Sequence, residues 1–259
     1  MNLPTYSIVI PAYQRVFGFQ EALDSALAVD GCQEVLVLDD HSDHDEFRRI
    51  VEAANHPRVR YLRNAENHGL FGNWNRGVQL ARGEFVSILC TDDVVTPDAY
   101  QLFANAYRSN PQLDVFFGTF CTFHDSTDTA VISKVYPPGP VSSLDLIADA
   151  VRHGPIFPVL HISRRSKVLE GPFVARPHSG NDWYWIYSNA TALKLHAVDK
   201  PINYWRRHSD QDAVVSSAIT TDCWPLMFLE MARQLHDSGH PRGQPLGQFS
   251  GPDRIRLER

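Results

Sequence analysis

Residues 83–97 read GEFVSILCTDDVVTP and predict a buried strand that ends at two adjacent carboxylates. The apolar run from Phe85 to Leu89 is the expected strand, and Asp92 and Asp93 follow it. Thr96-Pro97-Asp98 then supplies an N-cap, a proline at the first helical position and a first-turn acid. Two neighbouring carboxylates beside a buried strand are unfavourable unless they are paired, hydrated or bound to a metal. The pair alone is equally compatible with a turn in which one aspartate caps the next helix.

The chain before this stretch alternates strands with helices. Strands are expected at 6–13, 34–40 and 59–62, and amphipathic helices at 19–27, 42–54 and 74–81. The second strand also ends in two acids, Asp39 and Asp40, and Ser42 is the expected N-cap of the helix that follows. This order predicts an α/β fold, a Rossmann-like and mostly parallel sheet with helices on both faces and right-handed connections.

Composition and missing motifs exclude several classes of protein. The net charge of −6 gives no support for a nucleic-acid partner. Four widely spaced cysteines predict neither zinc ribbons nor a disulfide framework, and the longest apolar stretch, 115–123, is too short to span a bilayer. No Gly-x-Gly-x-x-Gly or Gly-Lys-Ser/Thr loop follows a strand. We therefore expect a soluble cytoplasmic protein.

The acids at the strand ends indicate a ligand class. The carboxyl ends of strands are where open α/β sheets bind ligands. A carboxylate there accepts a hydrogen bond from a base N–H or a ribose hydroxyl, and an acid pair holds Mg²⁺ or Mn²⁺ on a diphosphate. The residue chemistry thus favours a nucleoside-diphosphate ligand.

Several short motifs carry a resemblance that covers residues 5–105. They are Ser7-Ile8-Val9-Ile10-Pro11-Ala12-Tyr13, Val37-Leu38-Asp39-Asp40-His41-Ser42, Asn67-x-Gly69, Asn75-x-Gly77, Ala81-Arg82-Gly83-Glu84-Phe85 and Thr91-Asp92-Asp93. In this order and spacing the chain resembles the family 2 glycosyltransferases, which have the GT-A fold. The resemblance implies an inverting, metal-dependent enzyme that uses a nucleotide sugar, typically a UDP- or dTDP-sugar.

The resemblance also implies roles for residues of the first half. Asp39 would contact the base, and Asp92 and Asp93 would bind Mg²⁺ or Mn²⁺ and contact the ribose and diphosphate. The implied nucleotide-binding residues are Pro11, Ala12, Tyr13, Arg15, Asp39, Asn67, Asn75 and Asp92.

Two positions depart from the family pattern. The metal motif often reads Asp-x-Asp-Asp, but its first acid is replaced by Cys90, and a thiol is a poor ligand for Mg²⁺. Asn73-Trp74-Asn75 stands where Ala-Arg-Asn is frequent, so a basic contact to the diphosphate would come from elsewhere, for example Arg76 or Arg82. A solvated helix end is the alternative for these two arginines.

Asp182 opens an aromatic-rich helix in the second half. A first-turn acid stabilised by the helix dipole is the structural interpretation. In the family, an aspartate at this place is the general base, which must lie near the acceptor hydroxyl. Asn181-Asp182 keeps that aspartate and lacks the preceding glutamate. Trp183 and Tyr184 are candidates for stacking on an acceptor sugar, with core packing as the default.

Residues 204–211, Tyr-Trp-Arg-Arg-His-Ser-Asp-Gln, are a basic turn after an expected strand. They resemble a family segment in which arginine and histidine return over the diphosphate. By that resemblance His208 would complete the metal shell and Arg206 or Arg207 would contact the diphosphate, which suits the planar arginine fork. The sequence does not choose between the two arginines.

The remaining segments complete the expected organisation. Residues 1–105 would form a nucleotide-sugar-binding half and 106–236 the acceptor-binding and catalytic half of the same domain, and 237–259 a Gly/Pro/Arg-rich tail. One strand is expected over 114–123, a loop over 124–140, and helices after Ser142 and over 212–236. The histidines between His153 and His178 fit no helical metal site.

The predicted function is transfer of a sugar from a nucleoside diphosphate to a hydroxyl of a glycan or lipid-linked acceptor, by family analogy in surface polysaccharide biosynthesis. A non-catalytic nucleotide-sugar or glycan-binding module is one alternative. A sugar-phosphate nucleotidylyltransferase is another, although Pro11-Ala12-Tyr13-Gln14 is not its Gly-rich basic loop. Peripheral association with the inner face of the membrane and homo-oligomerisation stay open.

Overall fold

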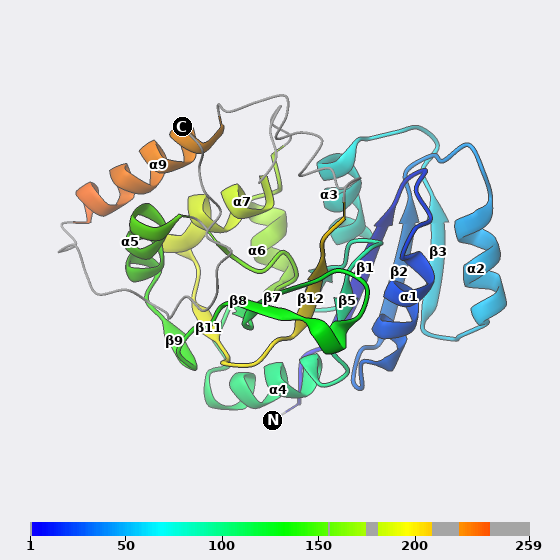
Figure 1. Ribbon diagram of the computed structural model, residues 1–259, viewed down its shortest axis with the longest axis horizontal. Coiled ribbons are helices and arrows are strands. Elements are labelled where there is room, and N and C mark those ends of the chain that lie inside the picture. Colours follow the sequence, from blue (N-terminus) through cyan, green and yellow to red (C-terminus); the bar gives the residue numbers. More distant parts are fainter. Residues whose placement is uncertain (1, 155, 175–180, 209–222, 239–259) are drawn as a thin grey trace.

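The parallel half of the main sheet forms as the sequence pattern predicts. The computed structural model describes residues 2–154, 156–174, 181–208 and 223–238. Its first strands are β1 (Tyr6–Ala12), β2 (Glu34–Asp39), β3 (Val59–Arg63) and β4 (Phe85–Ile88), and they alternate with α1 (Phe19–Ala28), α2 (Glu46–Ala54) and α3 (Leu70–Leu80). These strands pair in parallel in the order β3-β2-β1-β4. Figure 1 labels β1, β2 and β3 side by side at its right.

The second half of the chain extends this sheet to eight strands. The full order is β3-β2-β1-β4-β10-β6-β11-β9. The added strands are β6 (Val115–Phe117), β9 (Gly139–Val141), β10 (Ile162–Arg164) and β11 (Leu195–Ala197). Strand β10 is antiparallel to both β4 and β6, whereas β6 and β11 are parallel. The sheet is mixed α/β, and its parallel half carries the site.

A second sheet lies beside the carboxyl end of β4. It has the order β5-β12-β7-β8 and is built from β5 (Val94–Val95), β12 (Asn203–Arg206), β7 (Phe120–Phe123) and β8 (Val131–Lys134). Because β5 follows the acidic turn directly and β12 pairs with it, this sheet brings residues 203–208 back to the turn (Figure 1).

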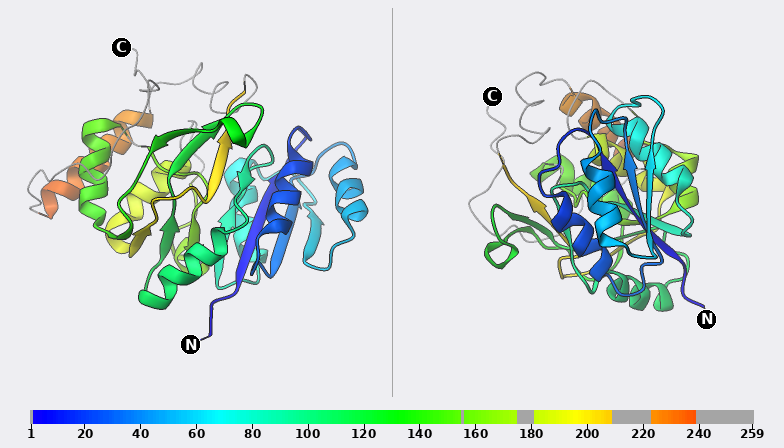
Figure 2. Two further views of the ribbon diagram at one scale, coloured as in Figure 1. Left: turned by 60° about the horizontal axis from the view of Figure 1, so that its bottom comes forward. Right: turned by 90° about the vertical axis from the view of Figure 1, so that its right-hand side faces the viewer.

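Helices cover both faces of the main sheet. One face packs on α1, α2 and α4 (Ala99–Ser109), and alternate residues of β1, Ile8 and Ile10, point into that core. Val9 points into the opposite core. That core contains side chains of α3 and of α5 (Ser143–His153), α6 (Arg165–Glu170), α7 (Asn181–Asn189) and α9 (Cys223–Asp237). Figure 2 shows the two helical layers.

The expected single strand over 114–123 is wrong, because the chain changes sheets within it. Gly118 separates β6 from β7, and a Cβ there would lie 2.4 Å from the Lys200 carbonyl oxygen. The expected loop over 124–140 contains β8, β9 and a 3₁₀ turn at Thr127–Thr129. Strand β9 pairs with the distant β11, and β8 pairs with β7 across the 3₁₀ turn, so these short edge strands depend on their partners more than on a local apolar run.

Three expected helix starts are also shifted, and one of these helices, α3, begins at Leu70 and not at Trp74. Helix α2 begins at Glu46 after Asp45, whereas Ser42 donates its hydroxyl to Asp39 (2.6 Å). Helix α4 begins after Asp98, not after Thr96. Helix α5 does follow Ser142, whose hydroxyl accepts from the Asp145 amide (3.3 Å). Of the helix expected over 212–236, residues 212–222 lie outside the described residues, as does the tail beyond 238.

Candidate functional site

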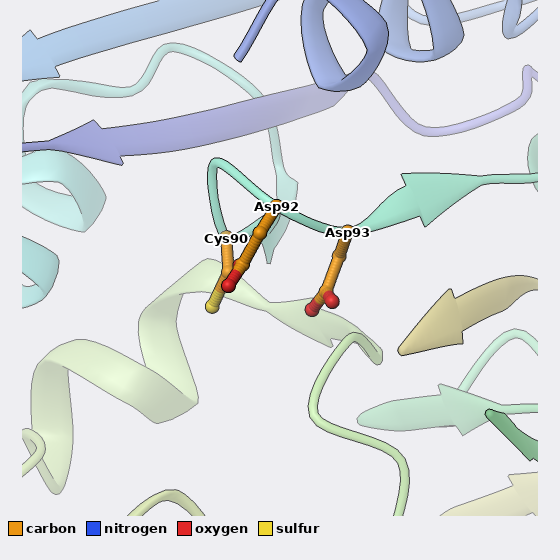
Figure 3. A group of neighbouring side chains, drawn as sticks. All are labelled: Cys90, Asp92 and Asp93. Carbon is orange, nitrogen blue, oxygen red and sulfur yellow. The ribbon is translucent and has the colours of Figure 1, made fainter. Parts of the chain in front are cut away.

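The acidic stretch forms a tight turn between β4 and β5. The Asp93 amide donates to the Cys90 carbonyl (3.2 Å), and the side chains of Cys90, Asp92 and Asp93 project to the same side of the turn (Figure 3). One ligand atom from each of the three lies within 4.8 Å of the other two. Neither aspartate caps α4, so the helix-cap alternative for this pair is wrong.

The loop before α1 is pressed against this turn. Gly18, the N-cap residue of α1, has φ of 78°, which favours glycine. A Cβ at Gly18 would lie 2.8 Å from the Asp92 Cα and 2.9 Å from the Thr91 carbonyl oxygen. Only glycine therefore lets the two segments meet, and the sequence interpretation missed this contact.

Asp93 is a buried carboxylate beside a second carboxylate. Its side chain is 1% exposed, and its Oδ1 accepts from the Arg206 amide (2.9 Å). Burial raises the pKa of Asp93 well above its usual range, and the charge of Asp92 raises it further. A bound cation would offset both effects, because it would compensate the two negative charges together.

Arg206 fixes the turn from β12. Its Nε donates to the Asp92 carbonyl (2.9 Å) and its Nη1 to the His124 carbonyl (3.0 Å), and its Nη2 contacts Glu21. Its guanidinium also lies over the Phe123 ring. The guanidinium is thus directed at protein groups. Arg207 lies over the Trp205 ring, 5.3 Å from its centre. The expected diphosphate contact of either arginine stays a prediction.

Two other side chains reach the Asp92 carboxylate. His208 Nε2 lies 2.9 Å and Arg15 Nη2 lies 3.3 Å from the same oxygen, Oδ2. Phe17, which is 54% exposed, packs edge-on against the His208 ring. The structure thus brings together Arg15, Asp92, Asp93 and His208, all predicted site residues, from three separate segments. Phe17 and Glu21 were missed, since only tertiary contacts reveal them.

Asp39 is enclosed at the end of β2. It is 0% exposed, its Oδ1 accepts from the Ser42 amide and hydroxyl, and its Oδ2 accepts from the Tyr61 hydroxyl (2.7 Å). Burial and the neighbouring Asp39 raise the pKa of Tyr61 to about 12, which keeps the phenol a donor. The expected contact of Asp39 with a base stays a prediction.

The other predicted nucleotide-binding residues line the same edge of the sheet or support it. Pro11 and Ala12 are buried at the end of β1, and Tyr13, just beyond it, is 50% exposed. Asn67 accepts from the Gly69 amide (2.8 Å). Asn75 exchanges two hydrogen bonds with the backbone of Phe173 (2.7 and 2.9 Å). Asn75 therefore holds the segment that precedes residues 175–180, which lie outside the described residues.

Arg82 lies at the opposite edge of the main sheet. Its amide donates to the Glu34 carboxylate (2.8 Å) at the start of β2, and its side chain is 74% exposed. This position excludes Arg82 as the diphosphate contact.

Asp182 lies in the first turn of α7 and keeps partial exposure. Burial nevertheless raises the pKa of Asp182 to about 6, against the opposing effect of backbone amides. Its charge helps to raise the pKa of Asp93, so the two carboxylates lie within electrostatic reach. Trp183 and Tyr184 are half-buried and pack on the core beneath α7. Their acceptor role stays a prediction, and His178 lies outside the described residues.

The fold and the site together define a class of α/β protein with an acidic ligand site. A parallel α/β sheet carries an acidic turn at its carboxyl edge, and a carboxylate of raised pKa is contributed by the second half. The glycosyl transferase family 2 model matches residues 7–156, more than half of the chain. The chain belongs to this family.

Curated relatives match over shorter stretches. Chondroitin synthase of Escherichia coli is 35% identical over 120 residues, 46% of this chain and 17% of the relative. The succinoglycan biosynthesis protein ExoO of Rhizobium meliloti (strain 1021) is 38% identical over 98 residues, 38% of this chain and 28% of the relative. The chain therefore spans less than a third of the length of either protein.

Solved structures share the fold over most of the chain. A crystal structure of S. aureus TarS residues 1–349 superposes with a TM-score of 0.65 at 17% identity, covering 90% of this chain and 72% of TarS. The same fragment in complex with UDP-GlcNAc gives 0.66 at 18% identity, covering 89% of this chain and 65% of that one. The GT-A fold is thus confirmed. Among the described residues, none of the helices has the length and apolar character needed to cross a membrane.

Proposed function

We propose that this chain is an inverting glycosyltransferase that moves a sugar from a nucleoside-diphosphate sugar to a hydroxyl of a glycan or lipid-linked acceptor. The observation that carries the proposal is the pairing of Asp92 and Asp93 at the carboxyl edge with Asp182 in electrostatic reach of them. Membership of the family supports it, as do relatives named for polysaccharide synthesis and a fold neighbour solved with UDP-GlcNAc.

The donor half of the site follows from the acidic turn. The carboxylates of Asp92 and Asp93 suit a divalent cation, which would neutralise charge on the diphosphate as the leaving group departs. Arg15 is the cation best placed to add a contact to that diphosphate, because it already reaches Asp92 from the β1–α1 loop. Arg206 acts instead by holding the turn through the Asp92 carbonyl and the Asp93 carboxylate.

Asp182 is the proposed general base. A pKa near 6 leaves its carboxylate ionised at neutral pH and yet more basic than an ordinary aspartate. It would accept the proton of the acceptor hydroxyl as that oxygen attacks the anomeric carbon opposite the diphosphate. A single displacement of this kind inverts the anomeric configuration. Trp183 and Tyr184 follow it on α7 and are the nearest candidates for the acceptor side.

Calorimetric binding of UDP and dTDP, with and without Mn²⁺, tests the donor site. We expect metal-dependent binding in the wild type and its loss in Asp93→Ala. Asp182→Asn should keep that binding and lose turnover, by about 10²–10⁴-fold for a general base. Unchanged turnover in Asp182→Asn would favour a non-catalytic binding module. Failure of the folded protein to bind any nucleoside diphosphate with metal present would overturn the transferase proposal.

A further inference from the structure

A sulfur atom lies where two carboxylates converge. The Cys90 thiol follows β4 directly and is partly exposed, and it shares a 4.8 Å cluster with the Asp92 and Asp93 oxygens (Figure 3). Cys32 and Cys121, in contrast, are buried in the protein interior. Cys90 is thus the thiol that a cation bound at the acidic turn would meet.

A ring nitrogen adjoins the same cluster. His208 Nε2 lies 2.9 Å from Asp92 Oδ2, and the edge of Phe17 packs against the imidazole. His208 belongs to the segment after β12, which the Arg206 bonds fix to the acidic turn. The cluster itself therefore offers one sulfur and carboxylate oxygens, and the His208 nitrogen lies beside it, against Asp92.

This donor set does not suit Mg²⁺. Magnesium requires near-octahedral oxygen ligands, whereas thiolate and imidazole ligands select Zn²⁺, Co²⁺ and similar ions. Zinc is commonly bound by cysteine, histidine and carboxylate together. An acid in place of Cys90 would give an all-oxygen cluster, so this one residue changes the chemistry of the site.

We infer that the cation site of the acidic turn takes a thiophilic divalent ion, Zn²⁺ or Co²⁺, through the Cys90 sulfur in preference to Mg²⁺. On binding, the thiol loses its proton to solvent and the sulfur forms the bond to the metal, with no change of oxidation state. The inference rests on the proposed function, because it concerns the ion that would bridge this turn to the donor diphosphate.

Cobalt spectroscopy tests the inference without an activity assay. Co²⁺ added to the full chain in the presence of UDP should produce a near-ultraviolet thiolate-to-cobalt charge-transfer band. Cys90→Ser should remove the band and weaken Co²⁺ and Zn²⁺ binding by about tenfold or more, the scale expected when a metal site loses a supporting group. Cys121→Ser, which changes a buried thiol of β7, should keep the band. Circular dichroism would establish that both variants are folded.

A second variant addresses selectivity directly. Cys90→Asp creates an all-oxygen cluster and should shift the preference of the site toward Mg²⁺ and Mn²⁺ in competition calorimetry with UDP. Metal-dependent UDP binding without a thiolate band, and with the same Zn²⁺ affinity in Cys90→Ser, would overturn the inference and leave the proposed function standing. Absence of UDP binding with every metal would overturn both.

Discussion

Arg15 and Arg206 both contact Asp92, but their surroundings differ. The Arg15 side chain is 33% exposed and reaches the Asp92 carboxylate at 3.3 Å. The Arg206 side chain is 6% exposed, and its guanidinium donates to two backbone carbonyls as well as contacting Glu21. A partly exposed guanidinium that contacts one carboxylate can turn toward a phosphate, whereas a buried one that satisfies backbone carbonyls cannot leave without exposing them. The two arginines therefore have separable roles.

Alanine substitutions should separate these roles. Arg15→Ala should weaken UDP binding by about 1.5–3 kcal/mol, roughly ten- to hundredfold, because a charge-assisted hydrogen bond is lost, and should leave the melting temperature unchanged. Arg206→Ala should lower the melting temperature, since the Asp92 and His124 carbonyls lose their donor. Arg82→Ala, at the far edge of the sheet, is the control and should change neither. An Arg206 variant with wild-type stability would contradict this division.

At the scale of elements, apolar runs and helical spacing were sufficient to predict the elements whose residues are contiguous in the sequence. The β1–β4 strands and their helices follow from apolar runs and helical spacing within each segment. The sheet change at Gly118 depends on Lys200 and Ile202, about eighty residues away, and no local signal reports it. The site divides in the same way. The acidic turn could be read from its position after a strand, whereas the fixing of that turn by Arg206 depends on the pairing of β12 with β5.

A buried ion pair joins β8 to α5, two elements of the second half of the chain. Lys134 and Asp149 contact each other with both side chains 0% exposed. Burial lowers the pKa of Lys134, and the Asp149 charge opposes this change. Such a pair contributes little when compared with a well-packed apolar pair, but one partner left alone is an uncompensated buried charge.

Three variants test this pair by urea unfolding. Lys134→Met should lower the free energy of unfolding by about 3–5 kcal/mol, because Asp149 stays buried without its cation. The double variant Lys134→Met/Asp149→Leu should recover most of that loss. Lys167→Met removes an exposed pair with Glu170 and serves as the control, with no measurable change expected. A double variant no more stable than Lys134→Met would contradict this account, because it would show that the loss of stability does not come from the uncompensated charge of Asp149.

At the scale of the whole molecule, buried carboxylates at the two edges of the parallel sheet have opposite pKa shifts. At the amino edge, Glu34 accepts from the Ser7 hydroxyl (2.6 Å) and the Arg82 amide (2.8 Å) and contacts Arg60. Burial alone would raise the pKa of Glu34, but these bonds outweigh it and the pKa is lowered. At the carboxyl edge, Asp93 is buried beside another carboxylate. The first arrangement stabilises the ionised carboxylate, whereas the second disfavours it, and a bound cation would compensate that cost.

This asymmetry predicts opposite results for two conservative substitutions, measured by thermal and urea unfolding in the presence of a chelator. Glu34→Gln should lower the free energy of unfolding by about 1–3 kcal/mol at neutral pH, because ionised Glu34 accepts stronger bonds than an amide does. A lowered pKa means that this contribution is complete above the ordinary value of 4.5 and is lost as the pH falls through the folded-state pKa, so wild type and variant should converge in acid.

Asp93→Asn removes a buried like charge while its Oδ1 can still accept from the Arg206 amide, so the metal-free protein should gain stability and lose metal-dependent UDP binding. A metal-free Asp93→Asn protein less stable than wild type would mean that Asp93 is held for the fold and not for a ligand.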